Sequence, residues 1–320
     1  MTLTSPETRH AQSNGIEIAY ETFGDPGDAP VLLVMGLGTQ MIAWPDELCA
    51  DLAARGHFVV RFDNRDVGLS THLSHLAAPT TRDLLLRRRR PPYRIKDMAA
   101  DMAGLLDELG LDSAHVVGAS MGGFIAQTFA LKYPQRTRSL TLIMTSTGSR
   151  RVGQARPRLL VQLLRRRVAA DRESAMLATL ETFRVIGSPG FVRDEDYLRD
   201  LSGRSYDRAY DPRGYRRQLG AVVAQPDRTK QLARLDVPTV VLHGLADPLV
   251  RPSGGKALAR TIPGAKFIGF PAMGHDLPRD LWPKFVDAIA VVAARGESRR
   301  SAEPAASAEP SSDSFGNRVD

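Results

Sequence analysis

The sequence predicts an α/β fold in which a mostly parallel sheet has helices on both faces and carries an inserted helical lid. Two observations support this prediction. Short continuous apolar runs, typical of strands buried on both faces, alternate with longer amphipathic segments. This alternation stops after residue 145 and resumes near residue 235, as expected for an insertion into one domain.

The individual elements follow from their residue patterns. The run VLLVM at residues 31–35 is a buried-type strand, and the segment 95–109 has apolar residues at helical spacing. Strands are expected at residues 16–23, 31–35, 58–62, 114–117, 140–144, 237–242 and 266–270, and helices at 44–55, 95–109, 121–133 and 281–294.

These elements divide the chain into four parts. Residues 1–145 and 236–296 are predicted to form the two parts of the core. Residues 146–235, which look helical and are rich in arginine and tyrosine, are predicted to form the lid. Residues 297–320 are small, polar and proline-bearing, so a disordered tail is expected there.

The composition is that of a globular protein with a substantial core, because 42% of the 320 residues are hydrophobic and 25% are charged. Cys49 is the one cysteine, which excludes a disulfide within the chain and weakly favours a reducing compartment. We find no signal-peptide pattern and no apolar run of about 18 residues that could span a bilayer. A cytoplasmic protein is therefore expected.

The formal net charge of +7 raises the possibility of nucleic-acid binding. The sequence has no zinc-finger spacing, no aromatic RNA-binding motif and no evident helix-turn-helix. No nucleic-acid partner is therefore expected, and arginine-rich composition is the simpler explanation of the charge.

The clearest chemical motif is VVGASMGGFI, in which Ser120 lies between Gly118 and Gly122 and between a predicted strand and a predicted helix. Strand, Gly-x-Ser-x-Gly and helix together form a nucleophile elbow. The two glycines are expected where side chains would collide on a strained turn. The elbow also places the serine at a helix N-terminus, where backbone N–H groups favour negative charge.

A serine hydroxyl needs a base, and the base needs an acid that orients it. Proteins with this elbow carry the acid and then the histidine after the serine, each beyond a late strand. Asp247 follows the strand predicted at 237–242, and His275 follows the strand predicted at 266–270. Asp276 adjoins the histidine and cannot readily reach round to orient it, so we interpret it as a loop or helix-capping residue.

Acyl transfer also requires hydrogen-bond donors for the developing oxyanion. The backbone N–H of Met121, directly after the serine, is one expected donor, and the N–H of Leu37 in the loop MGLGTQ is the other. A dinucleotide-binding loop is disfavoured there because the third glycine is missing. No cofactor and no metal ion are expected.

At this point the chain resembles the α/β-hydrolase superfamily from about residue 16 to residue 294, apart from the lid. The segment DNRDVGLS at 63–70 looks like the D-x-R-x-x-G-x-S segment after the fourth strand of many members. The stretches VLLVMGLGTQMIAWPDE, RFDNRDVGLS, HVVGASMGG and PGAKFIGFPAMGHDLP resemble, more closely, the actinobacterial lipase/esterase branch that includes aclacinomycin methylesterase.

The resemblance implies an eight-stranded α/β-hydrolase fold and the hydrolysis of carboxylic esters without a cofactor. Many superfamily members have His-Gly at the oxyanion loop, whereas this chain has Met35-Gly36, as the aclacinomycin-type branch does. Because the donor there is a backbone N–H, the chemistry is expected to survive this difference.

Other functions remain open at this stage. Haloalkane dehalogenases and epoxide hydrolases have an aspartate where Ser120 stands, which argues against both. Serine perhydrolases and carbon–carbon bond hydrolases share the triad. A non-catalytic binding protein on this fold is expected to have lost a triad member, and none is lost here. The fold alone does not decide the substrate.

Two arginine-rich segments allow two interpretations. The segment 156–168 combines arginines with an apolar stripe and is either a solvated helix face or a basic helix that contacts anionic membranes. A lipid-like ester substrate would suit the second interpretation, and a thioester is a further candidate substrate. One arginine-rich segment is the run Arg87, Arg88, Arg89 and Arg90. The other lies at the start of the lid and has Arg150, Arg151, Arg156, Arg158, Arg165, Arg166, Arg167 and Arg172, around the apolar stripe Leu159, Leu160, Leu163 and Leu164.

Overall fold

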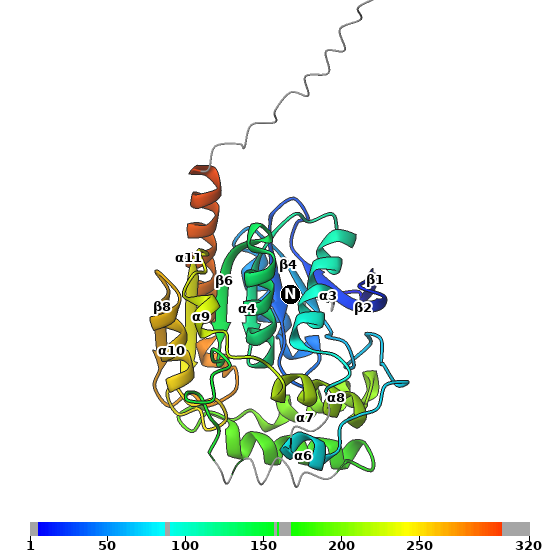
Figure 1. Cartoon of the computed structure of the whole chain (residues 1–320). Coiled ribbons are helices and arrows are strands. Elements are labelled where there is room, and N and C mark those ends of the chain that lie inside the picture. Colours follow the sequence, from blue (N-terminus) through cyan, green and yellow to red (C-terminus); the bar gives the residue numbers. More distant parts are fainter. Residues whose placement is uncertain (1–5, 87–89, 157–158, 160–167, 303–320) are drawn as a thin grey trace, which may run out of the picture.

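The computed structural model describes residues 6–86, 90–156, 159 and 168–302 (Figure 1). Eight strands form one sheet in the order β1-β2-β4-β3-β5-β6-β7-β8, and only the β1–β2 and β2–β4 pairings are antiparallel. The predicted eight-stranded, mostly parallel sheet is therefore confirmed. The strands are β1 (Arg9–Ser13), β2 (Ile16–Phe23), β3 (Ala29–Val34), β4 (His57–Phe62), β5 (Ala114–Ala119), β6 (Thr137–Ile143), β7 (Thr239–Gly244) and β8 (Lys266–Phe270).

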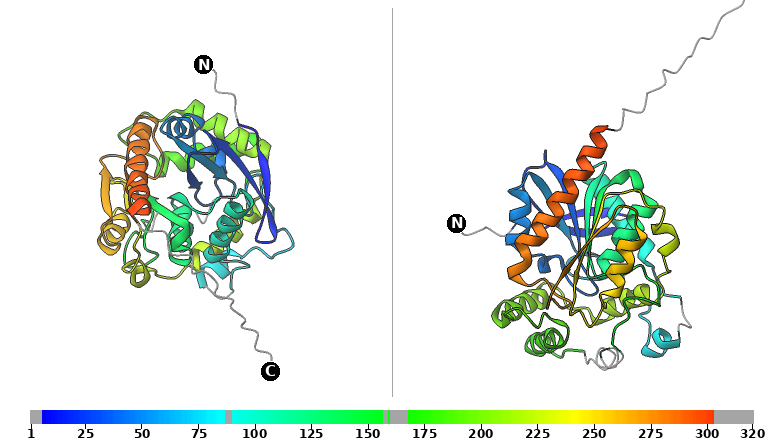
Figure 2. Two further views of the ribbon diagram at one scale, coloured as in Figure 1. Left: turned by 90° about the horizontal axis from the view of Figure 1, so that it is seen from above. Right: turned by 90° about the vertical axis from the view of Figure 1, so that its left-hand side faces the viewer.

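Helices cover both faces of the sheet (Figures 1 and 2). Alternate residues of the central strands pack to opposite sides, so that Leu32 and Val116 lie in one core cluster and Leu33 and Val117 in the other. The first cluster includes buried side chains of α3 (Ile95–Glu108), α4 (Met121–Lys132) and α10 (Ser253–Thr261), and the second includes those of α1 (Asp46–Ala53) and α11 (Trp282–Ala302).

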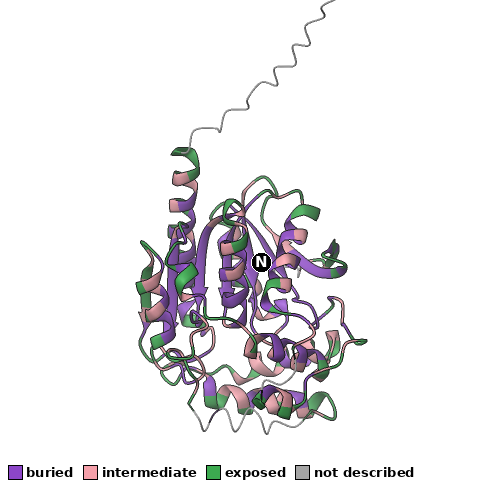
Figure 3. Ribbon diagram, in the orientation of Figure 1, coloured by how far each residue is buried: buried purple, intermediate pink, exposed green. Residues whose placement is uncertain are grey.

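Four described helices lie between β6 and β7. We call α6 (Arg172–Ile186), α7 (Glu195–Arg208) and α8 (Pro212–Val223) the lid helices. They lie beyond one end of the sheet, and their outer faces are exposed (Figure 3). The fourth helix, α9 (Thr229–Leu232), packs against α4 and α10, and its Leu232 belongs to the core.

The start of α8 is fixed by a capping aspartate and a proline. Asp211 caps the helix by accepting a hydrogen bond from the Arg213 N–H at 2.9 Å, and Pro212 occupies the first helical position. An aspartate cap followed by proline favours a helix start, because the proline has no N–H to leave unpaired. Among the described residues, the other helical elements include α2 (Thr81–Leu86), η1 (Met41–Ala43), η2 (Pro134–Arg136) and η3 (Arg279–Leu281).

Several parts of the structure differ from the sequence prediction, which placed no helix at α2 or α10. Strand β1 was not predicted, because RHAQS is polar and only two of its five residues are buried. The last helix, α11, continues to Ala302 and projects beyond the sheet, so the ordered chain extends past the boundary expected at residue 297 (Figure 1).

Several predicted features lie wholly or partly outside the described residues. These are the arginines at 87–89, most of the basic segment 156–168 and the last 18 residues of the predicted tail, 303–320. Within the described ranges, we find no helix that is both long enough and apolar enough to cross a bilayer.

Candidate active site

Strand β5 ends directly before Ser120, and α4 begins directly after it. Ser120 has φ 54° and ψ −116°, a conformation that a residue with a side chain rarely adopts. Its N–H donates to the Ile143 carbonyl at 2.9 Å, and its own carbonyl accepts from the Gly123 N–H at 3.0 Å. These bonds hold the serine in a strained turn at the carboxyl end of the sheet.

The glycines on either side of Ser120 are required by close packing. A Cβ atom on Gly118 would lie 2.4 Å from the carbonyl oxygen of Gly122. A Cβ atom on Gly122 would lie 2.1 Å from the carbonyl oxygen of Val34, in the neighbouring strand β3. Any larger residue at either position would displace the turn that carries the serine.

Three residues that are far apart in the chain meet at this turn. Oγ of Ser120 lies 3.0 Å from Nε2 of His275, and Nδ1 of His275 lies 2.7 Å from Oδ2 of Asp247. Asp247 and His275 are buried, whereas Ser120 is half-buried. The structure thus joins a hydroxyl, an imidazole and a carboxylate in one continuous chain of hydrogen bonds.

Backbone groups fix the carboxylate of Asp247. Its second oxygen, Oδ1, accepts hydrogen bonds from the N–H groups of Leu249 and Val250 at 2.8 and 2.9 Å. His243 holds the loop that contains Asp247, because its Nε2 lies 2.7 Å from the Val250 carbonyl. Because a carbonyl can only accept, Nε2 of His243 carries the proton. Burial lowers the pKa of His243, which keeps its ring neutral.

Asp276 faces a different partner from its neighbour His275. Its carboxylate accepts hydrogen bonds from the backbone N–H of Ser188 at 3.1 Å and from the Ser188 hydroxyl, which in turn accepts from the Gly274 N–H. The N–H of His275 donates to the Ile186 carbonyl at 2.7 Å. Asp276 is therefore a loop residue that ties the histidine loop to the segment after α6, and burial raises its pKa.

The loop after β3 passes over Ser120. A Cβ atom on Gly36 would lie 3.3 Å from the Ser120 Cβ. Leu37 follows at a half-buried position, and Met121 is buried in the first turn of α4. Leu37 and Met121, the two residues with the predicted oxyanion donors, thus belong to segments that adjoin the serine directly.

Sequence reasoning missed the polar residues through which the lid helices hold this loop. Gln218 of α8 accepts a hydrogen bond from the Gly38 N–H at 2.7 Å, and Gln40 donates to the Ser205 and Ala209 carbonyls of α7 and its cap. Arg208 of α7 donates to Gln40 at 2.9 Å. Nothing in the sequence indicated these pairs, because each joins residues at least 165 positions apart.

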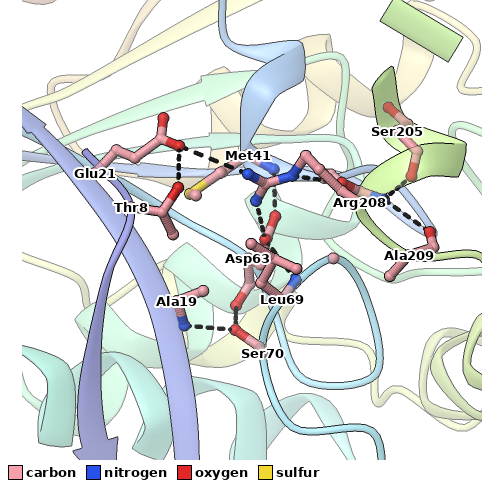
Figure 4. A network of polar contacts seen from close by, with 12 residues as sticks. Thr8, Ala19, Glu21, Met41, Asp63, Leu69, Ser70, Ser205, Arg208 and Ala209 are labelled. Atoms are coloured by element: carbon pink, nitrogen blue, oxygen red, sulfur yellow. Dashed lines mark hydrogen bonds and ion pairs between the residues drawn. The ribbon is translucent and has the colours of Figure 1, made fainter. Parts of the chain in front are cut away.

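Ion pairs of the half-buried Arg208 join α7 to the segment after β4 and to β2. Arg208 binds Asp63 at 2.6 Å and lies 3.7 Å from Glu21, as Figure 4 shows. Asp63 also accepts from the Met41 and Leu69 N–H groups at 2.7 and 2.9 Å (Figure 4). These partners hold the turns on both sides of the carboxylate.

Contacts of its own residues shape the segment DNRDVGLS at 63–70. A Cβ atom on Gly68 would lie 2.1 Å from a carboxylate oxygen of Asp63, so glycine is required there. The hydroxyl of Ser70 donates to the Asp63 carbonyl at 2.6 Å (Figure 4). Arg65 pairs with Asp101 of α3 through Nε at 2.6 Å, which fixes the other side of the loop.

Within the described chain, one cluster has the ligand spacing of a metal site, namely Asp66, His72 and Asp211. Arg217 already binds Asp66 at 2.7 Å and Asp211 at 3.0 Å. A guanidinium between the two carboxylates neutralises them and would repel a cation. We therefore interpret this cluster as an ion-pair network between α8 and the core.

Comparison with known proteins agrees with the geometry. Residues 29–278 match the family described as the alpha/beta hydrolase fold. The chain is similar to rhodomycin D methylesterase DauP of Streptomyces sp. strain C5, with 30% identity over 85% of this chain and 93% of that protein. Rhodomycin D methylesterase DnrP of Streptomyces peucetius is 29% identical over the same shares of the two chains.

A solved structure of an esterase is also similar to this chain. A thermophilic esterase from Thermogutta terrifontis superposes with a TM-score of 0.63 and 26% identity, over 92% of this chain and 98% of that one. The resemblance to an actinobacterial esterase branch is confirmed by the two Streptomyces relatives. The fold, the serine elbow and the match over residues 29–278 show that the chain belongs to the α/β-hydrolase family.

Proposed function

We propose that this carboxylic ester hydrolase acts through a covalent acyl-enzyme on Ser120, with His275 as the general base and Asp247 as the residue that orients it. The observation that carries the proposal is the hydrogen-bond chain from Ser120 through His275 to Asp247, with distances of 3.0 and 2.7 Å. A carboxylate only accepts, so Nδ1 of His275 carries the proton and Nε2 is free to take the serine proton.

The proposed reaction has two balanced halves. Oγ of Ser120 attacks the ester carbonyl carbon while Nε2 of His275 accepts the serine proton, and the tetrahedral intermediate forms. Its collapse breaks the bond to the leaving oxygen, which receives the proton from His275 and departs as the alcohol. Water then attacks the acyl-enzyme with His275 again as base, which releases the acid and restores Ser120.

We propose the backbone N–H groups of Met121 and Leu37 as the donors that stabilise the oxyanion. Met121 is the first residue of α4, so its N–H has no partner within the helix and points beyond the helix end. The helix dipole adds a favourable field for a negative charge at that end. Removing one such donor costs other enzymes about 10²- to 10³-fold in kcat.

Two enzymatic alternatives use the same three residues, namely a serine perhydrolase and a carbon–carbon bond hydrolase. The names of the similar methylesterases favour ester cleavage over either alternative. Product analysis separates the three, because ester hydrolysis yields an acid and an alcohol in equal amounts. A non-catalytic binding protein would bind esters without turnover.

For the substrate, we propose a small-molecule ester in which the acid is larger than the alcohol, as the methylesterase relatives suggest. Lipid esters and thioesters are further candidates from the sequence. The experiment is a panel of methyl esters and of p-nitrophenyl esters of increasing acyl length, run beside an acyl-CoA and a phospholipid. The Ser120→Ala variant should lose about 10⁴- to 10⁶-fold in kcat on every substrate that is cleaved. A loss below tenfold would contradict the proposal.

The basic segment 156–168 supports a separate part of the proposal, which is peripheral contact of the lid with anionic membranes. Each arginine near such a surface contributes about 1 kcal/mol. Replacing Arg165, Arg166 and Arg167 together by glutamine should therefore weaken binding to phosphatidylglycerol vesicles by about two orders of magnitude. Hydrolysis of a short soluble ester should not change. Wild-type protein that ignores these vesicles at low salt would contradict the contact.

A further inference from the structure

We infer that Gln218, on lid helix α8, is a positioning residue. It holds the loop of residues 35–40, here called the oxyanion loop, in the conformation that the reaction needs. The inference rests on the proposed function, in which the Leu37 N–H is an oxyanion donor. It assigns a fixed structural task to a helix that the sequence identified only as part of a lid.

The side chain of Gln218 is fully buried, and both ends of its amide are used. Oε1 accepts from the Gly38 N–H at 2.7 Å, and Nε2 donates to the Arg65 carbonyl at 2.7 Å. A backbone N–H only donates and a carbonyl only accepts, so these partners allow one orientation of the amide. Gln218 therefore bridges the loops that follow the adjacent parallel strands β3 and β4.

The Gly38 bond acts on the part of the loop that determines its shape. The Thr39 N–H donates to the Gly36 carbonyl at 3.3 Å, which closes a four-residue turn. Of the two central residues only Gly38 has a positive φ, 65°, as a type II turn requires. The central peptide supplies both the Gly38 N–H and the Leu37 carbonyl. Gln218 thus fixes this peptide and, through it, Leu37.

Close contacts place the turn between the serine and α8. On one side, a Cβ atom on Gly36 would lie 3.3 Å from the Ser120 Cβ. On the other side, a Cβ atom on Gly38 would lie 2.4 Å from the Tyr215 ring of α8. A shift of α8 would therefore move the loop that faces Ser120.

Helix α8 is itself firmly anchored. Arg217, adjacent to Gln218, binds both oxygens of Asp66 at 2.7 and 2.8 Å, and neither side chain of this pair is exposed. A buried pair of this kind resists separation, because each partner would be left as an unpaired buried charge. The anchor makes α8 a fixed support for the oxyanion loop.

The test compares Gln218→Met with Gln127→Met. Both glutamines are fully buried and use both ends of the amide, and the bonds of Gln127 go to the Ser146 carbonyl at 3.0 Å and to Arg228 at 3.2 Å. Methionine matches glutamine in shape but cannot replace these bonds. The two variants should lose similar thermal stability, but only Gln218→Met touches the oxyanion loop.

For a soluble p-nitrophenyl ester, Gln218→Met should lower kcat at least tenfold while KM stays within threefold, because the lost interaction acts on the transition state. Inhibition by a trifluoromethyl ketone, which forms an oxyanion adduct with serine, should weaken by a similar factor. Gln127→Met should leave both within threefold. Equal losses of kcat in the two variants, or a loss in KM alone, would overturn the inference.

A second variant tests the inference if Gln218→Met does not fold. Gln218→Glu keeps an acceptor facing the Gly38 N–H, but its ionised form cannot donate to the Arg65 carbonyl. Its kcat relative to wild type should therefore fall as pH rises through the titration of the introduced carboxyl. A ratio that does not change with pH contradicts the inference. Full activity of Ser120→Ala would instead contradict the proposed function.

Discussion

Nδ1 of His275 lies 2.7 Å from Oδ2 of Asp247, 28 residues away along the chain, whereas the adjoining Asp276 turns towards Ser188. The carboxylates of Asp247 and Asp276 thus have different surroundings. Asp247 accepts backbone bonds on one oxygen and faces the imidazole with the other. Asp276 fastens the histidine loop to the segment that follows α6.

This difference predicts unequal effects of two matched substitutions. Asp247→Asn should lower kcat about 10⁴-fold, because an amide at this site favours the wrong tautomer of His275. Asp276→Asn should lower kcat less than tenfold, because its partner is Ser188. Steady-state kinetics on one p-nitrophenyl ester measures both values. A larger loss in Asp276→Asn would show that the acid has been assigned wrongly.

The buried pair between Arg217 and Asp66 should dominate the anchoring of α8. Arg217→Met leaves Asp66 without its guanidinium partner at a fully buried position, so the free energy of unfolding should fall by about 3–5 kcal/mol. Arg204→Met removes the exposed pair with Asp200 on α7 and should cost about 0.5 kcal/mol. Urea unfolding of both variants provides the comparison. Similar losses would mean that the buried pair does not anchor the helix.

Buried histidines should make the fold sensitive to acid. Burial lowers the pKa of His115 to about 4, although Glu297 opposes the shift, and burial also lowers the pKa of His57. Between the ordinary histidine pKa of about 6.5 and pH 4, the unfolded chain binds protons that the folded chain does not bind. Stability is therefore complete above about pH 6.5 and is lost as pH falls through this window.

For His115 the loss between pH 7.5 and pH 5 should be about 2 kcal/mol in the free energy of unfolding. The groups that face this ring are Ser139, Arg138, Glu297 and His57. His115→Gln cannot titrate, so its unfolding free energy should depend less steeply on pH over the same interval. An unchanged pH dependence in this variant would contradict the assignment of His115 as a buried neutral ring.

Much of the core could be predicted from sequence because its signals are local. Strands β2 and β8 begin and end where alternation and apolar runs place them, and helix α3 follows its apolar stripe. Strand β1 was not predicted because an edge strand with one pairing partner needs few apolar residues. Its RHAQS sequence therefore reads as a polar segment.

The serine, aspartate and histidine could also be found, because each follows a strand in an order that the elbow motif specifies. The positions of Gln218 and Arg217 could not be predicted from the sequence. Their partners Gly38, Arg65 and Asp66 lie at least 151 residues away in the chain, and a buried glutamine or arginine in a lid helix gives no periodic signal. Only the fold shows that these polar residues face the core.

The most direct test of the account is the identity of the residue that carries the acyl group. After reaction with a fluorophosphonate, and separately after acid quench during turnover of a p-nitrophenyl ester, the protein should be digested and analysed by mass spectrometry. We predict that the added mass lies on Ser120 in both samples, is absent from Ser120→Ala and forms much more slowly in His275→Gln. Modification that persists in Ser120→Ala, or that lies on another residue, would contradict the account.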